Sequence, residues 1–85
     1  MGNLDAAIAD FTTSIGLNPT ASLYNTRGEM YQKQGKHNEA IQDFSNALQL
    51  VPNSAYSLRM RANSYEALGN MQQAQKDRQA AAQLR

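Results

Sequence analysis

The chain has 85 residues, which is enough for at most one domain. It contains no cysteine and a single histidine, so a disulfide framework, a thiolate metal site and a metal centre built on histidine alone are all excluded. Eight basic and seven acidic residues leave a net charge of +1, which disfavours the clustered basic excess typical of nucleic-acid-binding domains. We expect no cofactor.

The sequence carries no pattern typical of a membrane segment or a secretion signal. The longest stretch without charge, residues 11–26, contains Asn18, Pro19 and several hydroxyl residues, unlike a membrane span. Residues 1–5 lack the basic and apolar regions of a signal peptide. We therefore expect a soluble chain that has no membrane partner and is cytoplasmic by default.

Apolar and small residues recur at helical spacing along almost the whole chain and predict an all-α fold. Five helices are expected, over residues 3–17, 21–34, 37–50, 54–68 and 71–84. Pro19 and Pro52 follow the first and third helices, because proline cannot continue a helix. The residues that follow, Thr20 and Ser54, are expected N-caps.

Glycines mark the remaining boundaries. Gly35 and Gly69 lie where one helix must end and the next must begin within two or three residues, a place that favours glycine. Asn70 and Gln73 resemble a capping arrangement for the last helix.

One small pattern occurs three times, with glycine, alanine, aspartate and leucine at matching offsets. The copies are Gly2–Ala7–Asp10–Leu17, Gly35–Ala40–Asp43–Leu50 and Gly69–Ala74–Asp77–Leu84, spaced by 33 and then 34 residues. A fixed period of this size is typical of a solenoid of stacked helix pairs. This architecture favours recognition of a partner over catalysis.

The most complete copy of the pattern resembles the tetratricopeptide repeat, through Tyr24, Gly28, Tyr31, Gly35, Ala40, Phe44, Ala47, Leu50 and Pro52. The resemblance covers about two and a half repeats. It implies a right-handed α-solenoid of antiparallel helix pairs in a single domain, residues 1–85. A half repeat would occupy residues 1–19, a full repeat 20–53 and a further repeat 54–85.

Small and large residues alternate where the helices should cross. Gly28 and Ala62 are small because two backbones approach each other there, and Phe44 should fill the space beside them. Arg78 replaces this aromatic residue in the last helix. That helix should therefore be polar and lightly packed, which suits a helix facing water.

Two arginines, Arg27 and Arg61, occupy a position where the family more often has leucine. An aspartate lies in every second helix. We expect Arg27 to pair with Asp10 or Asp43, and Arg61 with Asp43 or Asp77, as a ladder of ion pairs that supports stacking.

The resemblance also implies a peptide-binding groove lined by the first helix of each repeat. The expected groove residues are Asn25, Glu29, Lys33, Tyr56, Arg59, Met60 and Asn63. Tyr56 and Arg59 should be the main anchors, because aromatic and guanidinium groups carry much interface energy. One subfamily captures the terminal carboxylate of chaperone tails, and Arg59 and Asn63 match the spacing of its first pair. Glu29 would repel a carboxylate, so a complete clamp is not expected.

The expected function is non-catalytic binding of a protein or peptide, and two alternatives stay open. The first expected helix lacks a partner helix, so parts of Leu4, Ile8, Phe11 and Ile15 should lack cover, and homo-oligomers could form there. Helical repeats of similar length also read RNA, although interleaved glutamates make nucleic acid an unlikely partner here. No constellation of catalytic residues is visible, so an enzyme is not expected.

Overall fold

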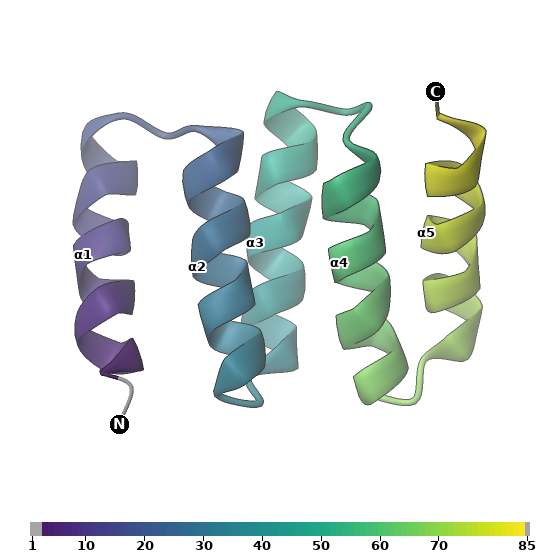
Figure 1. Cartoon of the computed structure of the whole chain (residues 1–85), viewed down its shortest axis with the longest axis horizontal. Coiled ribbons are helices and arrows are strands. Elements are labelled where there is room, and N and C mark those ends of the chain that lie inside the picture. Colours follow the sequence, from purple (N-terminus) through teal and green to yellow (C-terminus); the bar gives the residue numbers. More distant parts are fainter. Residues whose placement is uncertain (1–2, 85) are drawn as a thin grey trace.

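The computed structural model describes residues 3–84, which form five α-helices. Their bounds are α1 (Leu4–Leu17), α2 (Ala21–Lys33), α3 (His37–Leu50), α4 (Ala55–Ala67) and α5 (Met71–Gln83). The predicted bounds agree with these to within one residue at each end. Figure 1 shows the helices running up and down in succession, with α3 behind α2 and α4. Helices α2–α3 and α4–α5 form two antiparallel pairs, and the first helices of these pairs, α2 and α4, contact each other directly.

Side chains cap four of the helices, and three of these caps were predicted. Thr20 Oγ1 accepts a hydrogen bond from the Leu23 amide at 3.1 Å, and Ser54 Oγ accepts one from the Ser57 amide at 3.1 Å. The Asn70 side chain likewise accepts one from the Gln73 amide at 3.3 Å. These bonds satisfy amides that a helix leaves without an internal partner at its N-terminus.

The turns within the helix pairs depend on glycine. Gly35 and Gly69 have φ angles of +76° and +82°, in the left-handed region that other residues adopt at a cost. The amide after each glycine then donates back to a tyrosine carbonyl, Lys36 to Tyr31 and Asn70 to Tyr65. This arrangement closes each pair into an antiparallel hairpin.

The core follows the predicted alternation of large and small residues. Phe44 is completely buried, and a Cβ placed on Gly28 would lie 2.9 Å from its ring. Ala40, Ala47 and Ala62 are also completely buried. The backbone of α2 therefore approaches α3 closely enough that only hydrogen fits between Gly28 and the ring.

The prediction for α1 was wrong in part. Ile8 and Ile15 are each only 9% exposed, because they face α2, the one helix that α1 contacts within residues 3–84. Leu4 and Phe11 are half-buried, as expected of side chains that lack cover on one side. The incompletely covered side of α1 is thus narrower than its apolar stripe suggests.

Residues 3–84 contain neither a membrane-spanning helix nor a cluster of metal ligands. No helix in this range combines the length and the apolar character that crossing a bilayer requires. No three histidine, aspartate or glutamate side chains in the same range lie close enough together to hold a metal ion.

Candidate functional site

Each of the two predicted arginines binds the aspartate of its own helix pair. Arg27 Nε and Nη2 donate to the two carboxylate oxygens of Asp43 at 2.9 and 2.7 Å. Arg61 makes the same two bonds to Asp77, at 2.8 and 2.7 Å. Both aspartates are almost completely buried, so each pair is a bidentate bond held away from water.

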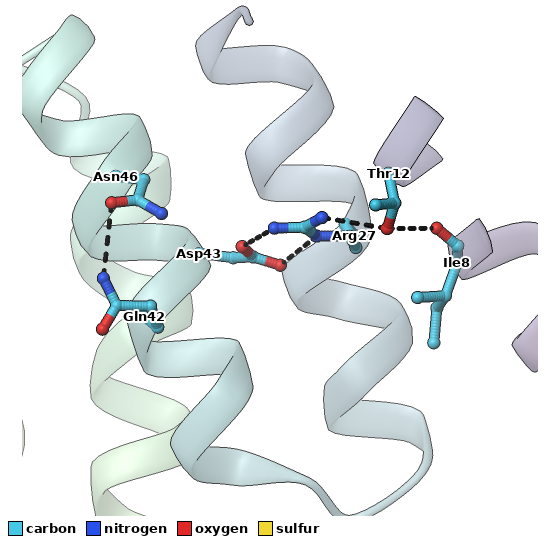
Figure 2. A network of polar contacts seen from close by, with 6 residues as sticks. All are labelled: Ile8, Thr12, Arg27, Gln42, Asp43 and Asn46. Carbon is cyan, nitrogen blue, oxygen red and sulfur yellow. Dashed lines mark hydrogen bonds and ion pairs between the residues drawn. The ribbon is translucent and has the colours of Figure 1, made fainter. Parts of the chain in front are cut away.

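Each arginine also reaches back to the preceding helix. Arg27 Nη1 donates to Thr12 Oγ1 at 3.0 Å, and Thr12 in turn donates to the Ile8 carbonyl, as Figure 2 shows. Arg61 Nη1 donates to Ser45 Oγ at 3.0 Å. One guanidinium therefore joins three consecutive helices. The hydroxyls of Thr12 and Ser45 were not predicted, although their 33-residue spacing matched the repeat.

Aromatic rings complete the surroundings of the arginines. The Arg27 guanidinium carbon lies 5.9 Å from the ring centres of both Tyr24 and Tyr31, and that of Arg61 lies 5.9 Å from the ring centre of Tyr65. The hydrogen bond to Asp43 raises the pKa of Arg27, partly opposed by burial, and Asp77 does the same for Arg61. Their exposed side-chain fractions, 16% and 22%, show that neither guanidinium is free in solvent, so the predicted ladder is confirmed.

The predicted groove residues lie on α2 and α4, and we name the set Asn25, Glu29, Lys33, Tyr56, Arg59, Met60 and Asn63 the α2–α4 face. Asn25 and Glu29 each accept one of the hydrogen bonds that cross between α4 and α2. Ser57 Oγ donates to the Asn25 side-chain oxygen at 2.8 Å, and the Tyr56 hydroxyl donates to the Glu29 carboxylate. Asn25 and Glu29 therefore serve to hold the two helices together.

Two further residues of the α2–α4 face are also engaged within the chain. The Asn63 side-chain oxygen accepts from Arg78 at 3.1 Å, and the same guanidinium pairs with Glu66 at 2.5 Å. Met60 is half-buried, and its carbonyl accepts from Gln32 at 2.9 Å. Lys33, Tyr56 and Arg59 remain exposed, with Tyr56 at 45%.

Sequence reasoning missed a polar contact between the two helix pairs. Gln32 Nε2 donates to Ser64 Oγ at 2.8 Å, and His37 Nδ1 lies 3.2 Å from the same oxygen. Ser57 and Ser64 are both completely buried. Two small polar residues seven apart in a helix share one face, and this spacing could have indicated that α4 meets α2 along that side.

A sequence model of the tetratricopeptide repeat matches residues 19–85. This chain belongs to the tetratricopeptide repeat family. It is 37% identical over 84 residues to the TPR repeat-containing thioredoxin TDX of Arabidopsis thaliana, covering 98% of this chain and 22% of TDX. It is 32% identical over 88 residues to the Tetratricopeptide repeat protein 36 homolog of Drosophila melanogaster, covering 98% of this chain and 48% of that protein.

Solved structures show the same fold. Two structures of MamA, AMB-1 and MSR-1, each superpose with a TM-score of 0.91 at 29% identity. The match covers 96% and 95% of this chain, and 49% and 47% of the two MamA chains. This chain thus spans less than half of the length of each of these relatives. Repeats of this family generally mediate protein–protein interaction.

Proposed function

We propose that this chain is a non-catalytic recognition module that binds a peptide or partner protein on the α2–α4 face. The observation that carries the proposal is that two arginines of the stack are paired with buried aspartates, whereas a third is exposed and unpaired within residues 3–84. Arg27 and Arg61 are held inside the stack by aspartates. Arg59 lies on α4 between them in sequence, is exposed, and makes no ion pair with any of residues 3–84. Its charge is therefore available to a ligand.

Neighbouring side chains add contact area around Arg59. Tyr56 lies three residues before Arg59 and four before Met60, and residues three or four apart share a side of a helix, so the Tyr56 ring lies next to both. The hydroxyl of Tyr56 donates a hydrogen bond to Glu29, which holds the ring in place before a ligand arrives. Binding then costs less conformational entropy, because the ring is already ordered. This combination suits a peptide that places an apolar side chain on the Tyr56 ring and a hydrogen-bond acceptor next to Arg59.

Binding can be tested with a peptide array against the isolated chain, followed by titration of the selected peptide. Arg59→Ala and Tyr56→Ala should each weaken binding by about tenfold or more, as expected for interface anchors. Lys76→Ala, which removes an exposed cation from α5, is the matched control and should leave affinity unchanged. Tyr56→Phe keeps the ring and removes only the bond to Glu29, so its effect should be smaller than that of Tyr56→Ala.

The proposal fails if Arg59→Ala and Tyr56→Ala both fold normally and bind the selected peptide as well as the parent chain. Self-association through α1 and RNA binding stay predictions. Sedimentation velocity across a range of concentrations tests the first, and an RNA titration at low salt tests the second.

A further inference from the structure

The side of α1 that faces away from α2 repeats a surface that is buried elsewhere in the molecule. We call Ala7, Asp10, Phe11 and Ser14 the outer edge of α1. These residues lie 33 positions before Ala40, Asp43, Phe44 and Ala47 of α3. All four α3 residues are at most 1% exposed, whereas Asp10 and Ser14 are exposed and Ala7 and Phe11 are half-buried. The same residues are therefore fully covered in α3 and incompletely covered in α1.

The helix that covers this surface on α3 has a defined chemistry. Arg27 of α2 makes two bonds to the Asp43 carboxylate, and Gly28 next to it lies against the Phe44 ring. In the second pair, Arg61 makes the same two bonds to Asp77. The next residue, Ala62, is again small and is completely buried. An arginine followed by a small residue is thus the complement of this surface in both places.

Charge favours the same complement on α1. Residues 1–26 contain two aspartates and no lysine or arginine, so the first cation in the chain is Arg27. Both equivalents of Asp10 bind an arginine through two bonds, and a planar guanidinium forms that pair better than an ammonium does. A half-buried aromatic ring beside an exposed carboxylate therefore has a complement in a helix of the α2 type.

We propose that the outer edge of α1 binds a partner helix that carries arginine followed by glycine or alanine. The guanidinium of that helix binds Asp10, and its small residue lies against the Phe11 ring. This surface lies on a different helix from the α2–α4 face, so the inference does not rest on the proposed function.

The chain itself supplies a suitable probe, a synthetic peptide with the sequence of residues 20–36, which includes Arg27 and Gly28. A lactam bridge between a lysine and a glutamate introduced at positions 22 and 26 would stabilise the helix, because isolated helices of this length are marginal in water. Addition of the peptide to the full chain should shift the amide NMR signals of Ala7, Asp10 and Phe11. Asp10→Asn in the chain should weaken binding by about tenfold or more, the usual effect of removing a charged hydrogen-bond partner.

Four controls sharpen the test. Glu39→Gln removes an exposed carboxylate from α3 and should leave binding unchanged. A peptide with Arg27→Lys keeps the positive charge but cannot form the bidentate bond of a guanidinium, so it should bind several-fold more weakly. A peptide with Gly28→Leu should also bind more weakly, because its side chain would meet the Phe11 ring. Arg59→Ala in the chain should have no effect, which separates this site from the proposed function.

Three results would overturn the proposal. The peptide could fail to bind at millimolar concentration, or it could shift the signals of α4 instead of those of α1. The chain could also form a concentration-dependent dimer that Asp10→Asn disperses, which would assign the outer edge of α1 to a second copy of the chain.

Discussion

The two helix pairs α2–α3 and α4–α5 share a backbone plan and an arginine–aspartate bond, but they differ in what fills the space beside that bond. In α2–α3 the space is filled by Phe44, which is completely buried against Gly28. In α4–α5 the same position is Arg78, whose side chain is 38% exposed and pairs with Glu66 at the surface. The fold is therefore maintained with the aromatic residue in one pair and without it in the other.

This difference indicates that the two helix pairs contribute unequally to the free energy of unfolding. Burial of an aromatic ring contributes several kcal/mol, whereas an exposed ion pair contributes little. The arginine–aspartate bond and the positive-φ glycine are common to both pairs and set their geometry. The pair α2–α3 should then be the stable centre of the stack, and α5 its weaker end.

The largest expected effect is the loss of the Phe44 ring. Phe44→Ala should lower the free energy of unfolding by about 3–5 kcal/mol, because it leaves a cavity in a close-packed core. Urea denaturation followed by circular dichroism measures this loss. Since small domains have only about 5–15 kcal/mol in total, the variant should be largely unfolded at a moderately raised temperature. A loss below about 1 kcal/mol would contradict the assigned packing.

Removal of a buried carboxylate should come next. Asp43→Asn should cost about 2–3 kcal/mol, somewhat below the ~3–5 kcal/mol of a fully buried pair, because the Arg27 side chain keeps some contact with water. Asp77→Asn should cost slightly less, because the Arg61 side chain is more exposed, at 22% against 16%. The same urea titration ranks the two variants. A larger loss for Asp77→Asn would reverse the comparison between the pairs.

The arginines themselves should introduce no pH dependence under ordinary conditions. Their pKa values are raised in the folded state, chiefly by hydrogen bonds to Asp43 and Asp77. A raised pKa means that their contribution is complete below the usual arginine range and is lost only as the pH rises through the folded value. The difference in stability between the parent chain and Asp43→Asn should therefore stay constant between pH 7 and pH 10.

A smaller effect should follow from adding one methyl group at the crossing of α2 and α3. Gly28→Ala should cost about 1 kcal/mol net, because the clash with Phe44 outweighs the better helix propensity of alanine. In a Phe44→Leu background the same change should become neutral or stabilising, since the ring is gone. If Gly28→Ala stabilises the parent chain, the close approach of α2 to the ring is wrong.

The smallest effect belongs to the surface pair of α5. Arg78→Ala should change the free energy of unfolding by less than about 1 kcal/mol, because exposed ion pairs contribute little. Arg78→Phe is the informative companion, because it restores the residue that the first pair has and should stabilise the chain. A loss from Arg78→Ala as large as that from Phe44→Ala would contradict the division of stability.

The sequence was most informative at positions where the backbone geometry favours one type of residue, such as glycine in a turn or a hydroxyl residue at a helix N-terminus. Gly35 and Gly69 could be assigned to turns because their backbone angles disfavour side chains, and Thr20 and Ser54 to caps because their oxygens satisfy free amides. The repeat restricted Arg27 and Arg61 to two aspartates each. Spacing alone could not choose between them, because the choice depends on which helix each guanidinium faces.

The candidate site was less predictable for a related reason. The groove prediction placed Asn25 and Glu29 on an open surface, and no sequence signal indicated that Ser57 and Tyr56 would bind them. The apolar stripe of α1 likewise suggested that parts of Ile8 and Ile15 would lack cover on one side, although both are only 9% exposed. Periodicity shows which residues share a face, but the direction of that face depends on the neighbouring helix.

Native-state amide hydrogen exchange, resolved residue by residue, tests the central comparison most directly. The account predicts that amides around Phe44 in α3 exchange only through global unfolding, and that amides around Arg78 in α5 exchange faster by local opening. Equal protection of the two helices, or slower exchange in α5 than in α3, would contradict it.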